Sequence, residues 1–306
     1  MTADLILHRG LFTTLDRSNP TATTVAITGG VFSAVGRDHD VMQDKGPSTT
    51  VVDLKARRVL PGLIDNHLHI IRGGLNFNME LRWDGIRRLA DGMAMLQRQV
   101  AITPPPQWVR VVGGFTAHQF DEKRLPTIGE LNAVAPETPV FLLHLYDRAI
   151  LNGAALRAVG YTKDTHEPPG GEIVRDAVGN PTGLLLAKPN AGVLYATLAK
   201  GPKLPFEYQL NSTRHFMREL NRLGVTGAID AGGGFQNYPE DYEVIRKLSE
   251  AGQLKSTSAG HAGLVTGTKV RWLCGVGRSQ GRRSGRVASQ ALRHLFMLNR
   301  VRRPQS

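Results

Sequence analysis

The segment Pro61–His69 constrains the fold of this chain more than any other. It reads Pro-Gly-Leu-Ile-Asp-Asn-His-Leu-His, and its apolar pair after a turn predicts a buried strand that ends in polar residues. Because side chains alternate between the faces of a strand, Asp65, His67 and His69 share one face. Neutral imidazoles on one side of a strand end are typical ligands of a divalent metal ion. We therefore predict a metal-ligand pair, His67 and His69; the alternative is an ordinary His-X-His sequence in a loop.

A second informative stretch, residues 205–250, alternates between helix and strand patterns. Apolar side chains at helical spacing predict a helix over 205–223, followed by a buried strand at Val225–Ile229 and a helix over 239–250. This order is typical of a parallel α/β fold. Asp230 directly follows the strand, so its carboxylate either lines a site or caps the next turn, and we favour the cap.

The first 60 residues read as short strands. Thr24–Thr28 and Val31–Val35 flank Gly29-Gly30, which predicts a hairpin because glycine tolerates a positive φ, and Thr49–Leu54 predicts a further strand. Residues 107–190, in contrast, look rich in loops. Within them we expect strands at 108–112 and 139–145 and a short helix at 152–159.

Positive charge is concentrated at the end of the chain. The net charge is +12, but residues 255–306 contain eleven Lys and Arg and no Asp or Glu, so residues 1–254 carry 38 − 11 = 27 basic against 26 acidic groups. Such a segment could contact nucleic acid or an anionic membrane. The alternative, which we favour, is a solvated sequence without a partner.

The remaining bulk features suggest a cytoplasmic protein. A single cysteine, Cys274, excludes an intrachain disulfide and fits a reducing compartment. The sequence shows neither the pattern of a secretory signal at Met1–Leu5 nor a run long enough to span a membrane.

Several segments occur together in an order that resembles a known family. They are Val59–His69, Pro136–Leu142, Leu151–Leu156, Pro168–Asp176, Gly179–Gly183 and Leu223–Thr226. From about Asp4 to Leu254 the chain resembles the amidohydrolase superfamily, in particular the YtcJ-like branch called amidohydrolase family 3.

This resemblance implies an α/β fold, a partial (β/α)8 TIM-type barrel with a small N-terminal β-sandwich subdomain and a loop-rich insertion. In such barrels the active site lies at the carboxyl ends of the strands, where His67 and His69 fall. The implied activity is hydrolysis of a C–N bond in a small amide-type molecule other than a peptide. One or two divalent metal ions, zinc before manganese or iron, would lower the pKa of a bound water.

The resemblance also suggests further site residues. Lys188 would be a third metal ligand if it were carbamylated, and the alternative is a plain solvated lysine. His118, Asp147 and Arg148 are candidate substrate contacts. For His118 the alternative is a plain surface histidine, and for Asp147 and Arg148 it is a buried ion pair. His144, in the preceding apolar strand, is either a hydrogen-bonded core histidine, which we favour, or part of a pocket. We assign no catalytic base.

Later parts of the expected site are missing from the sequence. The family takes further His ligands and a base Asp from later strands, whereas only His261 and His294 follow Leu254 and no Asp or Glu follows Glu250. We therefore interpret the chain as an incomplete member of the family. Its expected parts are a β-sandwich domain at 1–60, a partial hydrolase barrel at 61–254 with an insertion at about 78–190, and a foreign or disordered basic tail at 255–306. The alternatives to an enzyme are a non-catalytic fragment and a protein that binds anionic partners through this tail.

Overall fold

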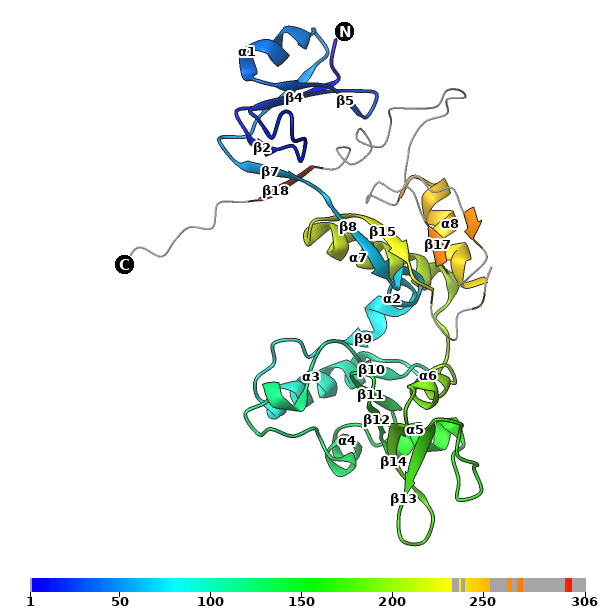
Figure 1. Cartoon of the computed structure of the whole chain (residues 1–306). Coiled ribbons are helices and arrows are strands. Elements are labelled where there is room, and N and C mark those ends of the chain that lie inside the picture. Colours follow the sequence, from blue (N-terminus) through cyan, green and yellow to red (C-terminus); the bar gives the residue numbers. More distant parts are fainter. Residues whose placement is uncertain are drawn as a thin grey trace. The chain divides into compact units, whose positions relative to one another are not determined.

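The computed structural model describes residues 2–232, 237, 240–253, 263–265, 269–271 and 295–298. The chain forms two compact units (Figure 1). The first unit comprises Met1–Ile70, Phe216–Gly232 and Arg246–Ser306, and the second comprises Ile71–His215 and Gly233–Ile245. Among the described helices, none is both long enough and apolar enough to cross a membrane.

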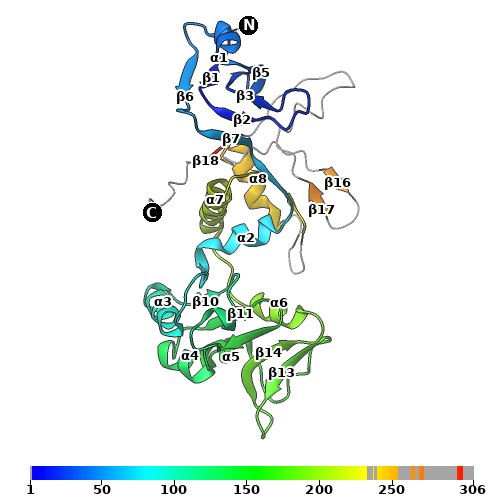
Figure 2. The same cartoon turned by 60° about the vertical axis from the view of Figure 1, so that its left-hand side comes forward.

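The N-terminal part of the first unit contains two four-stranded sheets. The first sheet has the order β5-β4-β1-β6, with strands Val31–Gly36, Thr24–Thr28, Leu5–His8 and Thr50–Asp53. The second sheet has the order β18-β7-β2-β3, with strands Leu295–Leu298, Arg58–Pro61, Leu11–Thr13 and Thr21–Ala22. A short helix α1 (Asp38–Val41) and a 3-10 turn η1 (Met42–Asp44) precede β6 (Figure 2).

Apolar residues of both sheets share one core. Phe12 of β2, Val25 of β4 and Val59 of β7 are buried in the same cluster. The predicted hairpin is confirmed, because β4 and β5 pair antiparallel across Gly29 and Gly30, whose φ angles are +57° and +77°. Burial of one face of each sheet is what holds these short strands together.

The third sheet of the first unit contains the strand with the two histidines. It has the order β16-β17-β15-β8, with strands Gly263–Val265, Lys269–Arg271, Val225–Asp230 and Leu63–Leu68. β8 and β15 run parallel, and helix α7 (Phe206–Arg222) directly precedes β15. Helix α2 (Ile70–Asn76) follows β8, and η4 (Glu240–Tyr242) and α8 (Glu243–Glu250) come after β15.

The prediction that the strand after Pro61 is buried was wrong. Leu63 and Ile64 are 58% and 61% exposed. The reason is the position of β8 in its sheet: within the described residues it pairs with β15 alone and therefore forms an edge.

The second unit is built on one six-stranded mixed sheet. Its order is β13-β14-β12-β11-β10-β9, with strands Gly171–Arg175, Pro181–Ala187, Arg148–Leu151, Val140–His144, Val109–Val111 and Glu80–Leu81. β9, β10 and β11 run parallel, and the other neighbours pair antiparallel. The unit also contains η2 (Phe77–Met79) and η3 (Ala117–Gln119).

Helices cover both faces of this sheet. The helices are α3 (Leu89–Ile102), α4 (Ile128–Val134), α5 (Gly153–Val159) and α6 (Gly192–Leu198). Val140 and Leu142 pack in one core with residues of α3 and α4, whereas Phe141 and Leu143 pack in another with residues of α5 and α6. Both faces of β11 are thus buried, which explains its uninterrupted apolar sequence. Figure 2 shows the sheet between α3 and α6.

The segment predicted as a loop-rich insertion, 78–190, supplies all six strands of this sheet. We predicted strands at 108–112 and 139–145 and a helix at 152–159, and these are confirmed as β10, β11 and α5. β12 and β14, of four and seven residues, were not predicted; both follow turn-forming residues. The regular sheet shows that this part has a core of its own.

Candidate metal centre

The strand β8 is held close to β15 at its start. A Cβ atom on Gly62 would overlap the side chain of Thr226, so only glycine allows the backbones to approach there. Leu63 pairs with Val225 and Leu68 with Asp230 in the parallel register. The ends of both strands consequently lie side by side, which is the edge at which α/β proteins place functional groups.

The two histidines lie together at the carboxyl end of β8. Their ring centroids are 5.5 Å apart and the ring planes form an angle of 79°. Asp65, expected on the same face, is used locally: its Oδ1 accepts a hydrogen bond of 2.9 Å from the backbone N–H of His67. Alternation along the strand thus brings His67 and His69 together as predicted.

Groups from the end of β15 orient this site. The Nδ1 of His69 hydrogen-bonds to the carbonyl oxygen of Gly232. A carbonyl can only accept, so Nδ1 carries the proton and the Nε2 lone pair is left for a ligand. This contact was missed by the sequence reasoning, because it joins residues 163 positions apart.

Asp230 reinforces the same junction. It is fully buried, and its Oδ1 accepts a 2.8 Å hydrogen bond from the backbone N–H of Ile70, the first residue of α2. The backbone N–H of Ala231 also donates to the carbonyl of Leu68 at 2.8 Å. We expected Asp230 to cap the turn that follows it, and most of that turn lies outside the described residues; within them its carboxylate reaches across to the helix that follows β8. Asp230 thereby joins the ends of β15 and β8 beside His69.

The spacing of the two imidazoles fits a shared metal ion. A zinc–nitrogen bond of about 2.1 Å places the ring centre about 3.2 Å from the metal, and two such rings at a tetrahedral angle are about 5.2 Å apart. The observed 5.5 Å is close to this value. Within the part of the chain that the structure describes, however, no three His, Cys, Asp or Glu side chains converge on one point. The described residues thus bring together two candidate ligands, His67 and His69.

Lys188 lies in the second unit and forms an ion pair with Glu172. Its side chain is 61% exposed. Carbamylation requires the neutral amine, whereas Lys188 is exposed and paired with a carboxylate. This environment fits the plain solvated lysine that we considered as the alternative.

Asp147 and Arg148 form a connected polar group with His144. Asp147 accepts 2.7 Å and 2.9 Å hydrogen bonds from His144 Nδ1 and Arg148 Nε. Burial opposes ionisation of Asp147, but these two hydrogen bonds outweigh it and hold the pKa of its carboxyl below the usual value. The side chain of His144 is largely buried, in agreement with the hydrogen-bonded histidine that we favoured.

His118 is exposed in η3, where its backbone N–H donates to Thr116 Oγ1. His261, His294, Cys274 and most of the basic tail lie outside the described residues.

Comparison with known proteins decides the family. The model of the amidohydrolase family matches residues 50–295, which is most of the chain. The chain belongs to the amidohydrolase family. The matched range extends beyond Leu254, where we expected the resemblance to end, and so includes part of the basic tail.

Curated relatives of this amidohydrolase are considerably longer. The chain is 31% identical over 257 residues to the N-substituted formamide deformylase of Arthrobacter pascens, and the alignment covers 83% of this chain and 46% of the relative. It is 30% identical over 224 residues to the putative amidohydrolase YtcJ of Bacillus subtilis (strain 168), covering 72% and 41%. The chain thus spans about half the length of the curated relatives that it matches.

A solved structure supports the fold of this family member. An uncharacterized metal-dependent hydrolase from Pyrococcus horikoshii aligns with a TM-score of 0.55 and 19% identity, covering 82% of this chain and 46% of that chain. The mixed α/β fold is therefore shared with metal-dependent hydrolases.

Proposed function

We propose that this amidohydrolase chain is part of a metal-dependent enzyme that hydrolyses a C–N bond in a small amide-type molecule. The observation that carries the proposal is the pair of imidazoles at the end of β8, spaced for one metal ion and oriented by Gly232. The deformylase relative, named for N-substituted formamides, suggests the class of substrate. Zinc is the metal that suits two neutral imidazoles best.

In this proposal His67 and His69 would hold the metal ion, His69 through its Nε2 atom. A zinc ion there would supply a Lewis acid and would lower the pKa of a bound water. Gly232 keeps the proton of His69 on Nδ1, and Asp230 keeps the ends of β8 and β15 in register. Asp147 and Arg148 are the proposed substrate contacts of the second unit. His118 stays a proposed substrate contact and Lys188 a proposed third ligand; both are exposed, as His67 is, and Lys188 is paired with Glu172.

We further infer that β8, α7 and β15 are the first strand–helix–strand unit of a partial (β/α)8 barrel. Parallel pairing of β8 with β15, and the helix that leads into β15, support this inference. The exposed edge of β8 would then face the remaining strands. Since only two ligands come from the described residues, we expect this chain by itself to be inactive or nearly so.

Metal analysis tests the ligand assignment. Purified protein is dialysed against a zinc buffer, and bound zinc is measured for the wild type, His67→Ala, His69→Ala and the exposed-histidine control His118→Ala. We expect each of the first two substitutions to weaken zinc binding at least tenfold, because each removes one of two imidazole ligands. The His118→Ala variant should bind zinc as the wild type does. Equal zinc content in all four proteins would refute the assignment.

A further inference from the structure

A cavity in the second unit is lined by none of the residues assigned so far. It has a volume of about 460 Å³ and opens at the amino ends of β10 and β11, where Trp108 and Pro139 precede the two strands. The opposite, carboxyl edge of these strands carries His144 and Asp147. Its volume is within the usual range for small-molecule pockets.

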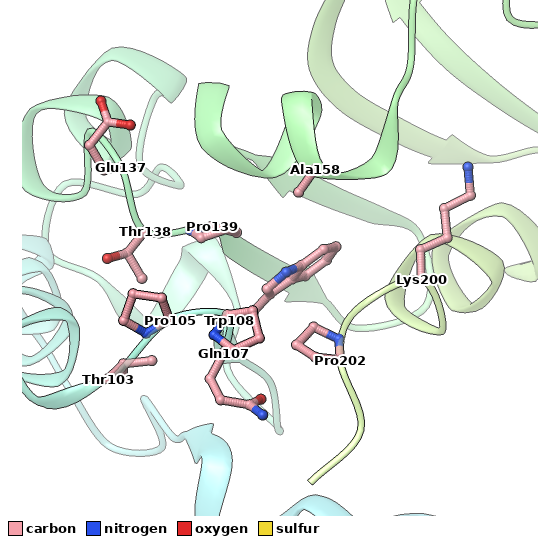
Figure 3. Close-up of a pocket in the computed structure, with 11 residues that line it drawn as sticks. Thr103, Pro105, Gln107, Trp108, Glu137, Thr138, Pro139, Ala158, Lys200 and Pro202 are labelled. Atoms are coloured by element: carbon pink, nitrogen blue, oxygen red, sulfur yellow. The ribbon is translucent and has the colours of Figure 1, made fainter.

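Rigid apolar groups form most of the wall. Figure 3 shows the indole of Trp108 between Ala158 of α5 and Pro202, with Pro105 and Pro139 nearby. Trp108 is almost fully buried in the core beneath. Proline rings and an immobile indole lose little conformational entropy when a ligand binds, and flat apolar surfaces favour a flat ring.

Gln107 provides a polar group without a counterpart. Its backbone N–H donates to Pro104, but its side-chain Oε1 is buried and accepts no hydrogen bond from the described residues. A buried acceptor without a donor costs free energy. A ligand N–H that donates to it therefore contributes more to the binding free energy than one that donates to a solvated acceptor. Gln107 lines the cavity, and because the last torsion of a glutamine side chain is broad, rotation of the amide would bring Oε1 to a ligand there.

The charged residues at the rim are already engaged. Lys200 Nζ donates to the carbonyl of Val159 at 3.1 Å and lies 4.4 Å from the ring centre of Tyr161. Glu137 forms a 3.2 Å ion pair with Arg157. Both charged residues of the lining therefore already have partners, whereas the buried Gln107 Oε1 accepts no hydrogen bond from the described residues.

We propose that this cavity is a binding site for a neutral aromatic molecule that carries an N–H donor, such as an aromatic amide. The ring lies against Trp108 and the prolines, and the N–H donates to Gln107 Oε1. This proposal uses none of the residues of the proposed metal centre and does not depend on it.

Ligand-observed NMR with benzamide and benzoate tests the proposal on the full-length chain. The two probes have the same shape, but benzamide offers N–H donors, whereas benzoate is a charged acceptor. We expect benzamide to bind with a dissociation constant on the order of 1 mM, as is typical of so small a ligand. Benzoate should bind about tenfold more weakly.

Three variants locate the binding. Gln107→Leu removes the acceptor and should weaken benzamide binding about tenfold. Ala158→Leu adds bulk at the cavity wall and should abolish binding, whereas Ala133→Leu, at an exposed alanine of α4, is the matched control and should not change it. Absence of benzamide binding to the wild type would overturn the proposal. So would full binding to Ala158→Leu, or benzoate binding as tight as that of benzamide.

Discussion

Replacement of Asn152 by alanine should be among the most destabilising single changes in the second unit. Asn152 is fully buried and precedes α5. Its Oδ1 accepts 2.9 Å hydrogen bonds from the backbone N–H groups of Val140 and Ala155, and its Nδ2 donates to the carbonyls of Ala135 and Thr138 at 2.6 Å and 2.9 Å. One side chain thus joins the start of α5 to the start of β11 and to the chain before it. At about 1 kcal/mol for each hydrogen bond, Asn152→Ala should lower the free energy of unfolding by about 4 kcal/mol.

Urea unfolding followed by tryptophan fluorescence measures this effect, since Trp83 and Trp108 both lie in the second unit. Asn132→Ala is the control: Asn132 is exposed and accepts one hydrogen bond of 2.7 Å, from the N–H of Gly153. It should cost about 1 kcal/mol or less. The reasoning is refuted if the two substitutions cost the same.

Three further predictions concern charge, packing and exposure. Burial raises the pKa of Glu80 to about 7 although Arg82 and Arg110 oppose the shift, so the stability associated with its protonated form is present below pH 4.5 and is lost as the pH rises through 7. We measure the free energy of unfolding of Glu80→Gln and of the wild type in urea. The difference, variant minus wild type, should be about 3 kcal/mol larger at pH 8 than at pH 5, and a constant difference would contradict this. Leu142→Ala removes a fully buried core side chain and should cost about 2–5 kcal/mol in the same assay; a cost below about 1 kcal/mol would contradict the packing. Ile64→Thr, at an exposed position, should change the free energy of unfolding by less than about 1 kcal/mol and reduce light scattering of concentrated protein, whereas a large loss of stability would mean that Ile64 is buried.

Features that depend on local pattern could be predicted from the sequence. The hairpin around Gly29 and Gly30 follows from the positive φ that both glycines adopt. The helix predicted over 239–250 from the spacing of apolar residues is present as η4 and α8, and its Tyr242, Ile245 and Leu248 are buried.

Other elements had signals that were overlooked or that are not local. Helix α4 begins with a capping box, in which Thr127 and Glu130 exchange hydrogen bonds, and this spacing is visible in the sequence. The exposure of Leu63 and Ile64, in contrast, depends on what covers the edge of β8. No local pattern encodes that, because it is a property of the whole sheet.

The candidate site, too, could be predicted from the sequence only in part. Alternation along one strand was sufficient to bring His67 and His69 together. The contacts of His69 with Gly232 and of Ile70 with Asp230 depend on the register of β8 against β15, two strands far apart in sequence. Such a register becomes visible only when the sheet is assembled.

X-ray absorption at the zinc edge of the zinc-loaded chain tests the central claim, the shared metal ion of His67 and His69, most directly. We predict two imidazole nitrogens at about 2.0–2.1 Å from zinc, together with oxygen ligands. The imidazole signal should disappear in the His67→Ala, His69→Ala double variant. A sulfur ligand, or an imidazole signal that survives the double substitution, would contradict the account.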